Sequence, residues 1–142
     1  VAGIPESWKH ARRSALDIGS VSANDDLGTG WYPPEAGARW MGRRAEFWLG
    51  GTGQPAHELA LSGYSPMGFL KQPLRLSVRV NGLELGERYV QPDSPEFKFV
   101  FPLPKLLAGT AELHVELAVD STHRIASDSR ELGLAFGQTQ LR

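Results

Sequence analysis

The chain contains no cysteine among its 142 residues. This absence excludes disulfide bridges, thiolate nucleophiles and cysteine-ligated zinc or iron–sulfur centres. Net charge is also nearly absent, because 15 lysine and arginine residues are balanced by 16 aspartate and glutamate residues, which leaves a formal charge of −1. Such a chain has no overall field that collects nucleic acid or an anionic membrane, so we expect neither as a partner.

Long apolar runs are missing as well. No stretch approaches the ~18–20 apolar residues that span a bilayer, and the first residues, with Glu6, Lys9 and His10, lack the apolar segment of a signal peptide. The compartment stays unknown on this basis, with the cytoplasmic side favoured. Because the chain starts with Val1 rather than methionine, we expect it to be a processed protein or, as the favoured alternative, a domain of a longer polypeptide.

The composition is that of one folded domain rich in turns. Hydrophobic residues make up 41% and charged residues 22%, as in ordinary globular proteins, and 142 residues suffice for a single core. The 16 glycine and 10 proline residues predict many turns and short strands rather than long helices.

Alternation of apolar and polar residues predicts a series of strands. The alternating runs lie at residues 45–49, 59–63, 74–80, 83–85, 97–101, 113–119 and 132–136. Asn81-Gly82, between two of these runs, predicts a tight type I′ hairpin. Trp48 has the opposite phase to Phe47 and Leu49, so its side chain is expected to point away from the core.

Many short strands without helical crossovers predict an all-β fold, an antiparallel two-sheet β-sandwich of jelly-roll type. We expect the sandwich domain to cover residues 30–142 and residues 1–29 to form an N-terminal linker or edge segment.

The residues that carry most metal and covalent chemistry show no recognisable pattern. The four histidines lack metal-motif spacing, and Asn24-Asp25-Asp26 lacks the glycine and the final glutamate of an EF-hand loop. We therefore expect no metal and no cofactor. No nucleophile elbow or phosphate loop occurs, so we expect no enzymatic activity. If a carboxylate pair cleaved glycosides, Glu35 and Asp128 would be the pair to test.

The most unusual segment is residues 30–44, which hold two tryptophans, one tyrosine, three arginines and one glutamate. Aromatic rings stack on the C–H face of a sugar, while arginine and glutamate form planar hydrogen bonds with hydroxyl groups, so this mixture favours a carbohydrate site. The alternative is that Trp31 and Trp40 fill the core, as tryptophans in a sandwich often do. Asp128 and Arg130 are predicted to pair and brace the loop before the last strand, although Arg130 could also reach a ligand.

These motifs resemble a known family. The order Gly30-Trp31-Tyr32-x-x-Glu35, Arg39-Trp40-Met41-Gly42-x-x-Ala45-x-Phe47, Val80-Asn81-Gly82 and Asp128-x-Arg130-x-Leu132-Gly133 is similar to that of β-sandwich accessory domains in bacterial glycosyltransferases and related glycan proteins. The resemblance covers about residues 30–142. It implies a jelly-roll, carbohydrate-binding-like fold without an established catalytic role. Met41 departs from the serine or threonine usual at its position, which removes one hydroxyl group.

The resemblance implies that five residues bind the ligand, and these are Trp31, Tyr32, Glu35, Arg39 and Trp40. It also implies that Asp128 and Arg130 brace them. The expected partners are a glycan or the parent glycosyltransferase chain. The alternative function is a protein-interaction or oligomerisation module, in which Trp48, Tyr64, Met67 and Phe69 form an apolar patch that docks on the parent chain or on a second copy to give a homodimer.

Overall fold

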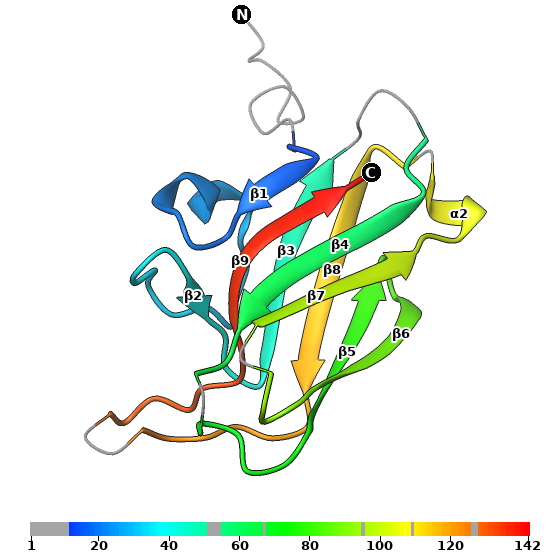
Figure 1. The fold of residues 1–142 in the computed structure, drawn as a ribbon. Coiled ribbons are helices and arrows are strands. Elements are labelled where there is room, and N and C mark those ends of the chain that lie inside the picture. Colours follow the sequence, from blue (N-terminus) through cyan, green and yellow to red (C-terminus); the bar gives the residue numbers. More distant parts are fainter. Residues whose placement is uncertain (1–11, 51–54, 67, 95, 109, 126–127) are drawn as a thin grey trace, which may run out of the picture.

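A computed structural model describes residues 12–50, 55–66, 68–94, 96–108, 110–125 and 128–142. The described chain forms two antiparallel sheets packed face to face (Figure 1). Sheet A has the strand order β1-β9-β4-β7, with β2 also paired to β9, and sheet B has the order β3-β8-β5-β6. The predicted two-sheet β-sandwich is confirmed.

The strands are short. Sheet A contains β1 (Ala15–Asp17), β2 (Arg39–Trp40), β4 (Glu58–Tyr64), β7 (Glu96–Pro102) and β9 (Ala135–Leu141). Sheet B contains β3 (Arg44–Gly50), β5 (Leu74–Val80), β6 (Leu83–Val90) and β8 (Glu112–Val119). The 3-10 helix η1 (Val21–Asp26) and the helix α2 (Lys105–Ala108) complete the described elements. Neither these helices nor any other in the described ranges has the length and apolarity to cross a membrane.

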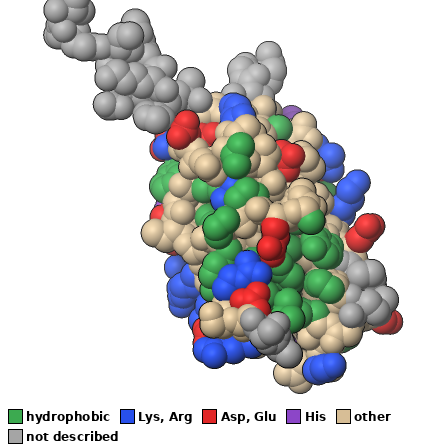
Figure 2. Space-filling view, turned by 90° about the vertical axis from the view of Figure 1, so that its left-hand side faces the viewer, with side chains coloured by type: hydrophobic (Ala, Val, Ile, Leu, Met, Phe, Trp, Pro, Cys, Tyr) green, Lys and Arg blue, Asp and Glu red, His purple; other side chains and the backbone are tan. Residues whose placement is uncertain are grey.

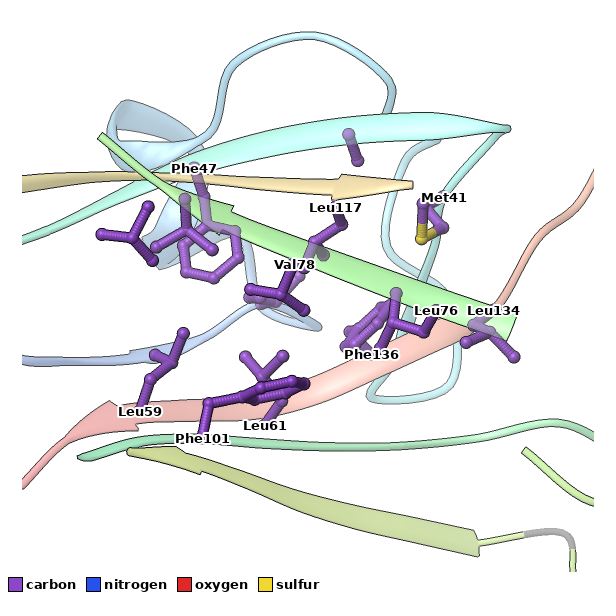
Figure 3. Close-up of a cluster of buried hydrophobic side chains, with 14 of the residues drawn as sticks. Met41, Phe47, Leu59, Leu61, Leu76, Val78, Phe101, Leu117, Leu134 and Phe136 are labelled. Atoms are coloured by element: carbon purple, nitrogen blue, oxygen red, sulfur yellow. The ribbon is translucent and has the colours of Figure 1, made fainter. Parts of the chain in front are cut away.

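The core lies between the two sheets, where the apolar positions of the alternating runs meet. Figure 3 shows side chains of sheet B pointing toward those of sheet A. The largest of them have almost no exposed surface, among them Phe47, Val78, Leu117, Leu59, Leu61, Phe101 and Phe136. Burial of each such side chain stabilises the fold by about 1.5–3 kcal/mol before the entropy of ordering the chain is subtracted.

The Asn-Gly hairpin forms as the sequence predicts. Asn81 and Gly82 have φ angles of 50° and 82°, the left-handed conformation that both central residues of a type I′ turn require. Because the right-handed twist of this turn matches that of the strands, β5 and β6 pair directly on either side of it. Trp48 points away from the core, as predicted, since Phe47 and Leu49 on either side of it are fully buried.

The last strand differs from the prediction. Alternation placed it over residues 132–136, whereas β9 begins only at Ala135. Every residue from Leu132 to Phe136 is buried, because this stretch is covered on both sides. Leu134 and Phe136 face the main core, while Leu132 and Ala135 pack into a second apolar cluster outside sheet A. Where both faces of a stretch are buried, alternation of apolar and polar residues does not show where the strand begins or ends.

The described part of the predicted N-terminal segment contacts both sheets, since β1 belongs to sheet A and Leu27 bridges to Phe47 on β3 of sheet B. Its β1 is the edge strand next to β9, with Leu16 opposite Thr139. Ile18 is fully buried and Asp26, at the end of η1, is nearly so. Residues 1–11 lie outside the described ranges, and the domain boundary at residue 30 stays a prediction.

Candidate functional site

The motif-rich segment folds as a hairpin on sheet A, which we call the fingerprint hairpin (residues 31–41). Trp31 pairs with Met41 at its base, and Glu35 pairs with Ala38 at its tip. The two residues between Glu35 and Ala38 have φ angles of 53° and 79°, so the tip is a second turn of the type I′ kind. The hairpin joins sheet A where β2 pairs with β9.

Trp31 anchors the hairpin to the main core. Its indole Nε1 donates a hydrogen bond to the backbone oxygen of Glu46 at 2.8 Å. Its ring meets Phe136 edge-on, with centroids 5.9 Å apart, and lies 6.5 Å from the ring of Phe47. The side chain is only partly exposed, so its contacts are those of a core residue at the rim. This placement favours the core-filling alternative for Trp31.

Arg39 is turned inward and its donors are used within the fold. The residue is 6% exposed. Its Nε donates to the backbone oxygen of Ile18 at 2.8 Å, and its Nη2 donates to the backbone oxygen of Ser20 at 3.1 Å and to Oδ1 of Asn24 at 2.8 Å. Burial lowers the pKa of Arg39 from its ordinary value, since desolvation disfavours the charged guanidinium. The guanidinium therefore fastens the hairpin to β1 and η1 instead of pointing toward a ligand.

Trp40 is the centre of the second apolar cluster. It is 4% exposed, and its ring lies 6.3 Å from that of Tyr64 and 5.2 Å from that of Phe69. Tyr32, Tyr64 and Phe69 are partly buried residues that pack against this cluster. The indole has no free face on which a sugar could stack, so we do not include Trp40 or Arg39 among the proposed contacts. The rings around Trp40 that are partly exposed, those of Tyr32, Tyr64 and Phe69, have surface that a ligand can contact.

A charged triad covers Tyr32 at the surface. Arg130 donates to Oδ2 of Asp128 at 2.7 Å and to Oε1 of Glu35 at 3.2 Å, so one guanidinium joins the loop before β9 to the hairpin tip. Its Cζ lies 5.3 Å from the centre of the Tyr32 ring, a cation–π distance. The Tyr32 hydroxyl donates to the backbone oxygen of Glu131 at 3.1 Å. Figure 2 shows hydrophobic side chains gathered around charged ones on this side of the molecule.

Two members of the triad, Asp128 and Arg130, have shifted pKa values. Hydrogen bonds from Arg130 lower the pKa of Asp128, and the hydrogen bond to Asp128 raises the pKa of Arg130. Glycoside cleavage needs one carboxyl group with a raised pKa that protonates the leaving oxygen. Glu35 and Asp128 both accept from the same guanidinium, and the lowered pKa of Asp128 disfavours that residue as the proton donor.

A groove of about 710 Å³ runs along the outer face of sheet A beside the hairpin tip, and we call it the sheet A groove. Its volume falls in the range of about 300–1,000 Å³ that is usual for small-ligand sites. Its lining combines two aromatic residues, Tyr64 and the buried Phe97, with hydroxyl and amide groups, one acid and one base. The lining residues are Ala36, Gly37, Ala38, Ser62, Gly63, Tyr64, Glu96, Phe97, Lys98, Gly137 and Gln138.

Sequence reasoning did not single out the groove residues. Ser62 on β4, Lys98 on β7 and Gln138 on β9 are ordinary outward positions of three alternating strands. Their only signal is the strand phase, which marks a side chain as outward but cannot show that three strands bring such residues together. The pairing of Ser62 with Lys98 and of β4 with β9 makes the groove.

The residues weighed as calcium ligands are used elsewhere. Oδ1 and Oδ2 of Asp26 accept from Arg12 at 3.1 Å and from Arg13 at 3.0 Å, and Asn24 accepts from Arg39. Nowhere in the described ranges do three or more histidine, aspartate or glutamate residues come close enough to hold a metal ion.

The predicted docking patch is not continuous. Trp48 lies on the outer face of sheet B, where its ring stacks on that of His114 with centroids 4.7 Å apart. Tyr64 and Phe69 lie outside sheet A, next to Trp40. Met67 is outside the described residues. Only the sheet A part of the patch can therefore form one surface.

Comparisons with known proteins identify the fold. No protein-family model and no curated protein matches the sequence. The structure is similar to an acetyl xylan esterase (Est2A) from the rumen bacterium Butyrivibrio proteoclasticus, with a TM-score of 0.55 and 13% identity over 89% of this chain and 31% of the esterase. The chain thus spans less than a third of that enzyme's length.

Two separate modules are matched over nearly their whole length. The CBM36-1 domain of a multidomain xylanase from the hindgut metagenome of Trinervitermes trinervoides gives a TM-score of 0.53 at 14% identity, over 90% of this chain and 94% of that one. CsCBM6-3 from Clostridium stercorarium, solved in complex with cellobiose, gives 0.51 at 12% identity, over 91% and 92%. The chain therefore has the β-sandwich fold of carbohydrate-binding modules.

Proposed function

We propose that the chain is a non-catalytic module that binds glycan in the sheet A groove, as part of a longer glycan-processing protein such as a glycosyltransferase. The observation that carries the proposal is the groove itself, which adjoins the fingerprint hairpin and presents Tyr64 beside amide, hydroxyl and charged groups. Among the predicted ligand residues on the same hairpin, Glu35 is exposed, and Tyr32 is partly exposed while it packs against the second cluster.

The chemistry of the groove suits sugar hydroxyl groups. Gln138 offers both a donor and an acceptor, Ser62 offers a hydroxyl group, and Glu96 and Lys98 offer charged partners of opposite sign. The phenol ring of Tyr64 is held in place by Trp40, so it loses little freedom when a sugar ring stacks on it. A shallow site with one ring and a few exposed hydrogen bonds is expected to bind in the micromolar to millimolar range.

Binding is tested on the purified chain with an array of neutral and acidic glycans, followed by NMR titration with the best ligand. Resonances of Ser62, Tyr64 and Gln138 are expected to shift. Gln138→Ala is expected to weaken binding about fivefold, the loss of roughly one hydrogen bond, while the control Gln72→Ala, at an exposed position outside the groove, leaves it unchanged. No binding across the array, or equal effects of the two variants, would refute the proposal.

The glycosyltransferase context rests on the order of the sequence motifs and on no contact in the structure. It predicts that a parent enzyme lacking this module keeps its rate on short acceptors and loses rate on polymeric ones. An equal loss on both acceptors would point instead to a module that stabilises its parent.

A docking function is the second candidate. The partly exposed rings of Tyr32, Tyr64 and Phe69 surround Trp40 on one side of the molecule, where hydrophobic side chains gather (Figure 2). If this surface joins two copies, the mass measured by sedimentation equilibrium will rise with concentration, and Phe69→Ser will abolish the rise. If the mass is that of a monomer at all concentrations, the homodimer is excluded.

A further inference from the structure

Two further hollows adjoin the sheet A groove. One, of about 220 Å³, shares Ser62, Lys98 and Gln138 with the groove and continues along β4, β7 and β9 toward Gln140. The other, of about 250 Å³, shares Glu96, Phe97 and Lys98 with the groove and continues over the edge of sheet A to β6. Lys98 lines all three hollows, and we call these three neighbouring hollows together the trough.

We propose that the trough holds an internal segment of a linear, uncharged polysaccharide, running from the hairpin tip past Lys98 to Tyr89, and not a single terminal sugar. This inference rests on the proposed glycan-binding function and adds the class and length of the ligand.

The length of the path supports an extended ligand. Between Gln138 on β9 and Lys98 on β7 lies the single strand β4, so two strand spacings separate them, or about 10 Å. Tyr89 belongs to β6 of sheet B, and packed sheets lie about 10 Å apart. The whole path is therefore on the order of 20 Å, which is long enough for several consecutive sugar rings.

Aromatic surface is available at both ends of the path. Tyr64 lines the groove near the hairpin tip, and Tyr89, with 52% of its surface exposed, lines the hollow at β6. Between them, Phe99 lines both smaller hollows and is stacked on Phe97 with centroids 5.1 Å apart. A ring at each end stacks on two sugars of one chain, so the second contact becomes intramolecular and strengthens binding without a second binding event.

The charges along the trough favour a neutral ligand. Lys98 and Glu96 have opposite signs and line the same hollows. Arg142, at the far end, is paired with Glu58 at 3.6 Å. The remaining polar groups are hydroxyl and amide groups of serine, threonine and glutamine. A polymer of uronic acids or phosphates would need an excess of basic side chains that this lining does not have.

Calorimetric titration of the wild-type chain with cello- and xylo-oligosaccharides, from the disaccharide to the hexasaccharide, tests the inference. Tetragalacturonate is the acidic probe, and hydroxyethyl cellulose and arabinoxylan are the polymers. Affinity is expected to rise about tenfold or more from disaccharide to hexasaccharide in the series that binds, because only the longer ligand reaches both Tyr64 and Tyr89.

Two variants test whether the end of the trough at Tyr89 contributes to binding of the longer ligand only. Tyr89→Ala is expected to weaken hexasaccharide binding about fivefold and to leave disaccharide binding within twofold, because the shorter ligand stays near Tyr64. Leu106→Ala, at an exposed apolar residue of α2 outside the trough, is the matched control and should change neither. The thermal midpoint of each variant confirms that it is folded.

The outcomes distinguish this inference from the proposed function. If disaccharide and hexasaccharide bind equally well, or Tyr89→Ala has no effect on either, the extended site is refuted, whereas the proposed glycan-binding function is not. If tetragalacturonate binds more tightly than every neutral ligand, the neutral class is wrong. If no glycan of any length binds, both proposals fail.

Discussion

Arg39 offers the sharpest test of how the fingerprint hairpin works. Motif resemblance assigns this residue to a ligand, whereas its burial assigns it to the fold. In Arg39→Leu the oxygen atoms of Ile18, Ser20 and Asn24 lose donors at 2.8, 3.1 and 2.8 Å. Each such bond contributes about 1 kcal/mol net, so the free energy of unfolding should fall by about 3 kcal/mol.

A loss of this size lowers the melting temperature of a domain of this length by about 10 °C. Arg39→Lys should lie between the leucine variant and the wild type, because one ammonium group keeps the charge but cannot reach three acceptors in different directions. The matched control is Arg43→Leu, whose exposed guanidinium donates to the backbone oxygen of Asp120 at a long 3.4 Å. It should change the free energy of unfolding by less than about 0.5 kcal/mol.

Urea unfolding followed by tryptophan fluorescence measures these changes, and glycan binding is measured on the same samples at a temperature where every variant is folded. The structural role predicts that Arg39→Leu is destabilised yet binds glycan within a few-fold of the wild type. The reasoning is refuted if Arg39→Leu unfolds at the same urea concentration as Arg43→Leu and has lost glycan binding.

Three further changes test other parts of the same region. Trp40→Ala should cost about 3–5 kcal/mol of unfolding free energy, because it removes the centre of the second cluster; a loss below 1 kcal/mol in urea unfolding would contradict its burial. Asp128→Asn should weaken the acid dependence of stability: Arg130 lowers the pKa of Asp128 in the folded state, so this contribution is present above about pH 4 and is lost as the pH falls through the lowered value. Thermal unfolding between neutral and acidic pH measures this, and parallel profiles for both proteins would contradict it. Gly133→Ala should destabilise the fold by about 1–3 kcal/mol, because a Cβ there would lie 2.6 Å from a backbone oxygen, whereas Gly137→Ala, with open space at its Cβ, should be nearly neutral in thermal unfolding.

Most of the sandwich could be predicted from residue alternation. Strands β3, β4, β5, β7 and β8 lie where apolar residues recur at every second position, and the β5–β6 turn lies at its Asn-Gly pair. Each of these strands has one face on the core and one face outward, which is the condition under which a period of two appears in a sequence. The strand pairing itself is a long-range property that no local pattern contains.

The placements that the sequence left open share a physical cause. The side chains of Trp40, on β2 of sheet A, and of Leu132, before β9, belong to the second apolar cluster, and both are buried because other segments fold over that side of the sheet. A residue such as Trp40, next to an arginine and between turns, looks exposed when only its neighbours in sequence are considered. Phe69, which is far from it in the chain, covers its ring in the structure. Burial of this kind depends on which distant loop packs over the residue, so it can be seen only in the three-dimensional structure.

The residues of the fingerprint hairpin have two different roles, to hold the hairpin on sheet A and to line the sheet A groove. Its most distinctive residues, Trp31, Arg39 and Trp40, are used to hold a short hairpin against sheet A, because so short an element has little pairing of its own. The hairpin tip then forms one wall of a groove whose other wall and floor come from ordinary outward residues of β4, β7 and β9. Those outward residues, such as Gln138, can change without loss of the core. If the chain binds glycan as proposed, ligand specificity should therefore follow the groove residues rather than the residues of the fingerprint hairpin.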